Sequence, residues 1–262
     1  MPVTDPSPRA AAAVENLPPF PHAALKVAEL LRNEPASLRL IADTLKTDAA
    51  LSAEVLRLAN SPLVEVRYKV TSVLQALALL GAGRVSNLIM TLTLSKMLAR
   101  AGRSDAMRRL WRHNLACALA AQQMVDGDEM DEAYYAGLFH DIGRLALFVQ
   151  EPALYDRALS EDRDVDEMEW SLFGVNHQEV GALVIEKWKL PRAFREVILG
   201  HRSPRGGDSK LTLLVHAACE VANRLGFSFL PLKDTDAELG PADELGYSIA
   251  LVINALECEY GI

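Results

Sequence analysis

The sequence predicts an all-α protein made of two helical lobes. Apolar residues recur at helical spacing along most of the 262 residues, and side chains that cap helices precede several of these segments. The only strand-like stretches, at residues 70–73 and 227–230, are too short to form a sheet, and we find no internal repeat of about 20–50 residues. Half of the residues are hydrophobic and 24% are charged, which is typical of a folded protein with a sizeable core.

The first lobe is expected over residues 15–104, after a flexible lead-in at residues 1–14. The prolines around Phe20 make its entry extended, because each proline fixes its own φ and keeps the preceding residue out of the helical region. Helices are predicted around residues 25–31, after the N-caps Ser37, Asp48 and Thr71 or Ser72, and over residues 85–98. Gly81 ends the fourth of them, and the turn-rich residues 101–104 separate the lobes.

The second lobe is expected over residues 105–225, followed by a helical extension at 226–262. Helices are predicted over residues 105–125, 131–149, 151–159, 176–189, 191–200 and 210–225, with a last one near 247–258. The acidic run at residues 161–169 is interpreted as a solvated loop or helix end, because runs of like charge usually stay hydrated.

The charge balance and the cysteine content indicate which classes of function are excluded and in which cellular compartment the protein is expected. The chain has 27 basic and 35 acidic residues, a net charge of −8, which argues against a protein that coats a nucleic acid or an anionic membrane. Its three cysteines are widely spaced and form no disulfide framework, so we expect a reducing, cytoplasmic environment. The N-terminus lacks the features of a secretory signal, and no apolar run reaches the roughly 18 residues of a membrane span, so no membrane insertion is expected.

Histidines are concentrated in the second lobe, where one of them is followed by an aspartate. Neutral imidazole and carboxylate are ligands for divalent metals. Adjacent residues on a helix point about 100° apart, so His140 and Asp141 can share a metal only in a groove that several helices surround. Such a groove would bring together His113, His140, Asp141, His177 and His201. Alternatively, each histidine is an ordinary core or surface residue and Asp141 caps a neighbouring helix.

These residues lie in a series of motifs that resembles a known family. The motifs are Leu17-Pro18-Pro19-x-Pro21, Leu56-Arg57-Leu58-Ala59-Asn60-Ser61, Ala76-x-x-Leu79-Leu80-Gly81, Trp111-x-His113, Gly137-Leu138-Phe139-His140-Asp141-Ile142-Gly143, Asn176-His177-x-Glu179-Val180-Gly181-Ala182, and Trp188-x-Leu190-Pro191 followed by His201. Their order and spacing resemble the HD superfamily of metal-dependent phosphohydrolases, and specifically the HDOD domain, the HD-related output domain of bacterial signalling proteins. The resemblance covers about residues 15–225.

The resemblance implies that the second lobe is an HD-domain-like helical bundle. It also implies that His113, His140, Asp141, His177 and His201 are the ligands of a divalent metal, with Fe, Mn, Zn and Mg all left open. A signalling protein is the implied partner. Cyclic di-GMP signalling is the implied context, because HD-GYP relatives cleave cyclic di-GMP.

The chain departs from the hydrolases of this superfamily at two positions. Arg202 stands where they carry a second histidine, and Cys219 stands where they carry a late aspartate ligand; the GYP signature is also absent. Cys219 is either a soft metal ligand or a small buried helix residue. The resemblance therefore implies a degenerate metal site, no assigned catalytic residue and a regulatory role through binding. The alternative is a metal-dependent phosphohydrolase that acts on nucleotides or cyclic dinucleotides.

Basic side chains near the motifs are candidates for contacts with a ligand. Arg112, Arg144 and Arg202, together with Cys219, are candidate contacts for a phosphate or another ligand, because guanidinium pairs bidentately with phosphate. Arg112 also belongs to a basic cluster with Arg100, Arg103, Arg108 and Arg109, which is either an exposed helix face or a contact for a phosphate or an acidic partner.

Residues 38–59 could be read as a helix-turn-helix that binds DNA. Between Asp48 and Asn60, however, the second helix carries two acidic residues and one arginine. Since DNA binding requires basic side chains on that helix, we expect no nucleic-acid partner. The sequence does not predict an oligomeric state.

Overall fold

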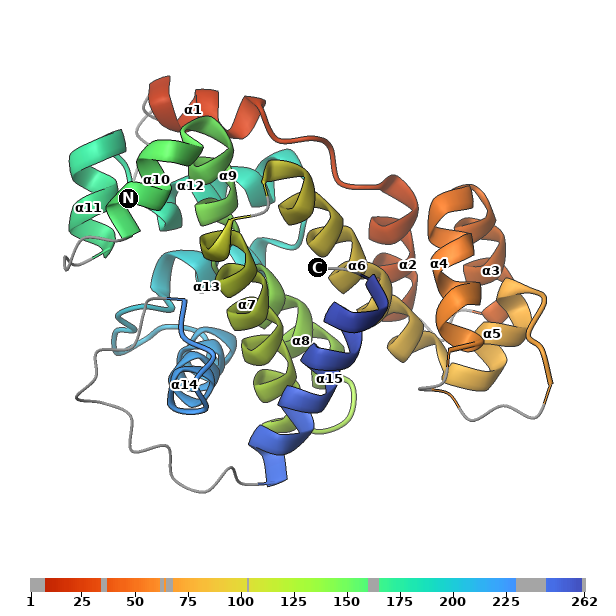
Figure 1. Cartoon of the computed structure of the whole chain (residues 1–262). Helices are drawn as coiled ribbons and strands as arrows, with labels where there is room; N and C mark the ends of the chain where they lie inside the picture. The colour runs from red at the N-terminus through yellow and green to blue at the C-terminus, as the bar shows by residue number, and fades with distance from the viewer. Residues whose placement is uncertain are drawn as a thin grey trace. The chain divides into compact units, whose positions relative to one another are not determined.

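The computed structural model describes residues 8–33, 37–61, 64, 68–102, 104–159, 165–229 and 244–260. Within these ranges the regular elements are α-helices and no strand occurs, so the predicted all-α class is confirmed (Figure 1). The helices are α1 (Pro8–Glu15), α2 (His22–Asn33), α3 (Leu38–Lys46), α4 (Ala49–Ala59), α5 (Val73–Leu80), α6 (Ala82–Ala101), α7 (Asp105–Gln123), α8 (Glu129–Phe139), α9 (Ile142–Gln150), α10 (Pro152–Leu159), α11 (Val165–Phe173), α12 (His177–Lys187), α13 (Arg192–Gly200), α14 (Lys210–Arg224) and α15 (Glu244–Tyr260).

The chain divides into two compact units, whose bounds differ from the expected ones. Residues 20–94 form the smaller unit, and residues 1–19 together with 95–262 form the larger one. The sequence placed this boundary at the turn-rich residues 101–104. In the structure α6 is one continuous helix from Ala82 to Ala101, and the division falls inside this helix.

The smaller unit is a cluster of short helices whose starts are capped as the sequence predicts. Ser37 accepts a hydrogen bond from the backbone N–H of Leu40, Asp48 accepts from Ala50 and Leu51, and Ser72 accepts from Gln75. These side chains satisfy N–H groups that have no partner within their own helices. The helices α3, α4 and α5 contact one another, and α2 contacts α3.

The larger unit is organised around α7, which packs against α8, α14 and α15 (Figure 1). A second group forms where α12 packs on α9 and α13. Residues 8–14, expected as part of the lead-in, lie in α1 instead, because the alanine run has high helix propensity and buries Ala10, Ala13 and Val14 against α9 and α12. Lys187 on α12 donates to the carbonyl oxygens of Val14 and Leu17 and holds the end of α1 in place.

One predicted helix is wrong in a way that matters for function. The sequence predicted a single helix over residues 131–149, whereas the structure has α8 and α9 with a break at His140 and Asp141. Asp141 leaves the helical region, with φ −106° and ψ 18°. At this break both side chains face the same interior space, where His140 Nε2 lies 3.7 Å from Asp141 Oδ2.

No single helix in the described residues is long and apolar enough to cross a membrane. The pair α5 and α6 meets that criterion jointly, by length and composition alone, with a bend of 111° between the two helices.

Candidate functional site

Five elements of the larger unit supply the side chains that the sequence predicts as a site. His113 comes from α7, His140 and Asp141 from the break between α8 and α9, His177 from the first position of α12, His201 from the end of α13, and Cys219 from α14. All six are buried. The structure therefore brings these residues together, while their role as metal ligands stays a prediction.

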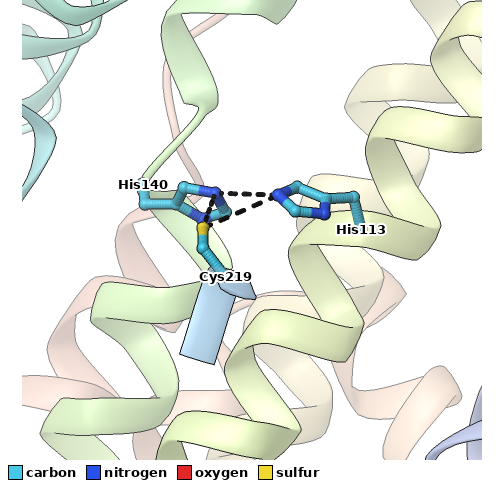
Figure 2. A group of neighbouring side chains, drawn as sticks. All are labelled: His113, His140 and Cys219. Carbon is cyan, nitrogen blue, oxygen red and sulfur yellow. Dashed lines mark hydrogen bonds between the residues drawn. The ribbon is translucent and has the colours of Figure 1, made fainter. Parts of the chain in front are cut away.

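His113, His140 and Cys219 form one end of this cluster (Figure 2). The two Nε2 atoms lie 3.3 Å apart. The Cys219 Sγ atom lies 3.2 Å from His140 Nε2 and 3.7 Å from His113 Nε2. Three donor atoms from three helices thus surround one small space, and Cys219 lies beside the histidines as predicted.

Asp141 joins this end of the cluster to a second one. Its Oδ1 atom lies 3.3 Å from His177 Nε2 and 3.4 Å from His201 Nε2. Its Oδ2 atom lies 3.7 Å from His140 Nε2. Asp141 Oδ1 and His201 Nε2 are buried and have no hydrogen-bond partner. Buried polar atoms normally have a partner, so this pair marks a place where a proton or cation is expected.

Each of the four histidines is oriented by an acceptor behind its ring. The Nδ1 atoms of His113, His140 and His201 face backbone carbonyl oxygens at 2.8, 2.7 and 2.9 Å, and Nδ1 of His177 faces a carboxylate oxygen of Glu169 at 2.6 Å. A carbonyl or carboxylate can only accept, so every Nδ1 carries a proton and donates it. In the neutral rings the Nε2 lone pairs then point into the cluster, as they do in metal-binding histidines whose other ring nitrogen donates to a carbonyl or carboxylate.

These residues fit a divalent cation. His113, His140 and Cys219 form one group of donor atoms that lie within 4.8 Å of one another, and His140, Asp141 and His201 form another. Imidazole, thiolate and carboxylate are ligands that zinc and other transition metals accept. When bound, such an ion would act as a Lewis acid and would neutralise the negative charge of its ligands.

A buried arginine, however, already neutralises part of the cluster. Arg144 lies one turn after Asp141 and donates to Asp141 Oδ2 at 2.9 Å and to Glu169 Oε1 at 2.9 Å. Only 2% of its surface is exposed, and its guanidinium lies 4.7 Å from the centre of the Phe229 ring. Tyr155 donates to the same Glu169 oxygen at 2.7 Å. Arg144 therefore binds two carboxylates of its own chain, whereas the sequence proposed it as a contact for a ligand.

The local charges shift several pKa values in the cluster. Burial opposes the charged form of Asp141, but Arg144, His140 and His177 together hold its pKa well below the usual range. Burial likewise opposes the imidazolium form of His140, but Cys219 and Asp141 raise the pKa of His140 to about 9. A hydrogen bond from Cys117 is the largest cause that lowers the pKa of Cys219 far below that of a free thiol. These shifts favour a negatively charged Cys219 and Asp141 beside a positively charged His140.

The remaining basic residues face other groups. The Arg202 guanidinium lies 3.4 Å from Asp166 at the edge of the cluster. The Arg112 guanidinium lies 3.8 Å from Glu257 and 5.7 Å from the Phe227 ring centre. Within the basic cluster, Arg108 pairs with Asp105 and Arg109 donates to the Phe229 carbonyl oxygen, while Arg103 falls outside the described residues.

Sequence analysis missed Glu169, which the structure places in the centre of the network. The acidic run was expected to be solvated; residues 161–164 lie outside the described residues, but for Glu169 this expectation is wrong, because its side chain has no exposed surface. Glu169 accepts from the backbone N–H and Nδ1 of His177. The sequence signal that could have indicated its burial is that it lies between Met168 and Phe173, two apolar residues that are both buried on α11.

Glu169 is expected to make the protein sensitive to acid. Burial raises its pKa, but His177 and Arg144 lower it more, to about 2, against an ordinary value of 4.5. Because the folded-state pKa is the lower one, the stabilisation is present above about pH 4.5 and is lost as the pH falls toward 2. The shift corresponds to about 3 kcal/mol at neutral pH.

This expectation can be tested by urea unfolding of wild type and Glu169→Gln between pH 7 and pH 3. Wild type should lose stability steeply below about pH 4.5, and the variant, less stable at pH 7, should show a shallower slope there. The exposed residue Glu220 provides the control, since Glu220→Gln should keep the wild-type slope. Equal slopes for wild type and Glu169→Gln would contradict the assignment.

Comparisons with known proteins agree with the resemblance seen in the sequence. The family model of the HDOD domain matches residues 17–204, more than half of the chain. Among solved structures, an HDOD domain protein of unknown function from Geobacter sulfurreducens is 24% identical, with a TM-score of 0.71, and the match covers 96% of this chain and 94% of that chain. A phosphohydrolase candidate from Shewanella amazonensis SB2B is 22% identical, with a TM-score of 0.65, over 96% of this chain and 95% of that chain.

A curated relative extends beyond the matched region. An uncharacterized protein of Treponema pallidum (strain Nichols) is 21% identical over 198 residues, which are 72% of this chain and 38% of that protein. This chain therefore matches well under half of that relative's length. The match of the family model over residues 17–204 shows that the chain belongs to the HDOD domain family.

Proposed function

We propose that this protein is a regulatory HDOD module that binds a signalling partner and does not hydrolyse phosphate esters. The observation that carries the proposal is the buried ion-pair network in which Arg144 contacts both Asp141 and Glu169 at 2.9 Å. Asp141 is the carboxylate that the family resemblance implies as a metal ligand. Here the arginine of its own chain already holds one of its two oxygens.

The charge balance of the cluster argues against a two-metal hydrolytic centre. The buried charged groups are the Cys219 thiolate, the Asp141 and Glu169 carboxylates and the Arg144 guanidinium. These groups sum to a charge of −2, and His140, whose pKa is raised to about 9, adds one positive charge until it gives up its proton to a metal. The cluster can therefore balance one divalent cation and not two. A second ion would also lie close to a guanidinium in a medium of low dielectric constant, where repulsion between like charges is strong.

Arg144 is held too firmly to move aside for a second ion. Its side chain is almost fully buried, and it contacts two carboxylates and the face of an aromatic ring. Displacing it would leave Glu169 as a buried carboxylate that has lost the guanidinium at 2.9 Å, and breaking a buried ion pair in this way costs several kcal/mol. Membership of the HDOD family supports a signalling role in place of turnover, with a protein partner as the expected binding target.

An active phosphohydrolase is the second candidate, because four histidine Nε2 atoms converge on Asp141 and Cys219. A direct assay separates the two candidates. Phosphate release from nucleotides and cleavage of cyclic di-GMP are measured for wild type, Asp141→Asn and the exposed-site control Asp156→Asn, each with added Mn²⁺, Fe²⁺ or Zn²⁺. We expect no turnover above the protein-free control for any of the three proteins.

The regulatory role is tested in the same series by complementation of a strain that lacks the gene. Wild type and Asp156→Asn should restore the phenotype, and an Asp141→Asn protein that folds should retain partner binding. The proposal is overturned if wild type turns over a nucleotide or cyclic dinucleotide and Asp141→Asn abolishes both that turnover and the complementation.

A further inference from the structure

We propose that His113, His140 and Cys219 form a three-donor site for a single Zn²⁺ ion, in which the Cys219 thiolate selects zinc over harder divalent cations. The three side chains come from α7, the end of α8 and α14, and their donor atoms face one another (Figure 2). The inference goes beyond the proposed regulatory function, because it names the ion, the number of ions and the residue that sets the selectivity.

The hydrogen bonds of the two rings leave a place that needs a positive charge. Nδ1 of His113 donates to the Phe227 carbonyl oxygen and Nδ1 of His140 donates to that of Gly137. If both rings were neutral, two unprotonated Nε2 atoms would face each other 3.3 Å apart, so without an ion one ring carries an extra proton. With the sulfur of Cys219 beside them, three electron-pair donors share one space, and either an extra proton or a cation must lie between them.

The distances between the donor atoms are those of ligands around one zinc ion. Zinc binds imidazole nitrogen at about 2.0–2.1 Å and thiolate sulfur at about 2.3 Å, so tetrahedral ligands lie about 3.4 Å apart for two nitrogens and about 3.6 Å for nitrogen and sulfur. The nitrogen pair is 3.3 Å apart, and the two nitrogen–sulfur distances are 3.2 and 3.7 Å. The three side chains can therefore bind an ion after shifts of a few tenths of an ångström.

A second cysteine, Cys117, stabilises the thiolate form of Cys219 and is not itself one of the three metal donors. The Cys117 sulfur lies 3.8 Å from the Cys219 sulfur and 3.9 Å from the Val215 carbonyl oxygen, so its thiol can donate to either. Burial and the neighbouring thiolate keep Cys117 protonated, since both raise its pKa. Cys117 is therefore expected to act as a hydrogen-bond donor to the ligand and not as a ligand.

Replacing a carboxylate by a thiolate changes which metals the site prefers. Mg²⁺ and Mn²⁺ favour oxygen ligands, whereas a thiolate with two imidazoles suits Zn²⁺. The buried charges of the cluster balance one divalent ion, as derived above. The Arg144 guanidinium beside Asp141 supplies positive charge at the other end of the cluster, where a second ion would otherwise bind.

The experiment measures metal binding by the full chain, purified without a histidine tag. Elemental analysis and competition titration should give one Zn²⁺ per chain, bound at least about 100-fold more tightly than Mn²⁺. The chain loaded with Co²⁺ in place of Zn²⁺ should show a thiolate-to-cobalt charge-transfer band. Cys219→Ala should abolish the band and weaken Zn²⁺ binding by more than about 100-fold, because loss of an outer-shell partner alone costs 10–100-fold.

Matched cysteine variants keep the test specific. Cys258→Ala, at an exposed position, should leave the band and the affinity unchanged, and Cys117→Ala should keep the band with weaker binding. Cys219→Asp should lose the band and shift the preference toward Mn²⁺, and it replaces Cys219→Ala if that variant does not fold.

Three results would each overturn the proposal: no stoichiometric Zn²⁺ uptake, equal affinity for Zn²⁺ and Mn²⁺, or a charge-transfer band that survives in Cys219→Ala. The outcome is separable from that of the proposed function. Turnover that Asp141→Asn abolishes together with complementation would refute the regulatory proposal without changing the cobalt spectrum, and absence of zinc would leave the hydrolysis assay unaffected.

Discussion

Arg144→Met should lower the free energy of unfolding by about 3–5 kcal/mol, the range observed when one partner of a buried ion pair is removed. Methionine fills much of the same space, but it leaves the carboxylates of Asp141 and Glu169 buried without the guanidinium that contacts both at 2.9 Å. The loss should therefore come from unpaired charge more than from a cavity. Urea unfolding at pH 7, followed by circular dichroism, measures it.

Two further variants show that the effect belongs to the buried network. Arg144→Lys keeps the charge but lacks the guanidinium whose Nε and Nη1 atoms donate to two different carboxylates, so it should lose some stability but less than Arg144→Met. Arg108→Met removes an exposed pair with Asp105 and should cost no more than about 1 kcal/mol. A cost for Arg144→Met as small as that for Arg108→Met would show that Arg144 is not a structural cation.

The sequence predicted which residues lie in the site better than it predicted the ion pairs and hydrogen bonds that join them. His113, His140, Asp141, His177 and His201 were identified because imidazole and carboxylate are metal-ligand types and because their order and spacing match a family pattern. Arg144 was noticed only as a candidate ligand contact. Its distance of three residues from Asp141 was a signal for an ion pair, but only the fold shows that the pair is buried.

Two other features depended on tertiary packing and could not be inferred from local patterns. The apolar periodicity of residues 131–149 continues through His140 and Asp141, so it gave no sign of the break between α8 and α9. Glu169 stands in an acidic run that suggests hydration, and it is buried only because His177 and Arg144 face it. In both cases contacts within the buried polar cluster outweighed the local preference, for a continuous helix in one case and for hydration in the other. Functional or strained sites are where such local preferences most often fail.

Gly143→Ala should be about as disruptive as the arginine variant, although alanine is the better helix former by about 1 kcal/mol. Gly143 lies in the first turn of α9, where that helix crosses α12. A Cβ atom there would overlap the His177 carbonyl oxygen and approach the Gly181 backbone nitrogen to 2.7 Å. Both obstacles are backbone atoms of one helix, so no side-chain rotation relieves them.

The helices α9 and α12 would have to separate, which moves Asp141 and Arg144 away from His177. We expect the free energy of unfolding to fall by about 3 kcal/mol or more, above the usual 1–3 kcal/mol of overpacking, because backbone and not side chains must give way.

Two other glycine-to-alanine variants serve as controls with smaller expected losses of stability. In Gly181→Ala the nearest atom is the Ile198 methyl carbon Cγ2 at 2.9 Å, which can rotate aside, so the loss should be smaller. In Gly206→Ala nothing lies within 4 Å, and the free energy of unfolding should change by less than about 0.5 kcal/mol. Urea unfolding of the three variants should rank Gly143→Ala first and Gly206→Ala last. A Gly143→Ala protein as stable as wild type would mean that α9 and α12 do not approach this closely. The contacts of Asp141 and Arg144 with His177 described above would then be wrong.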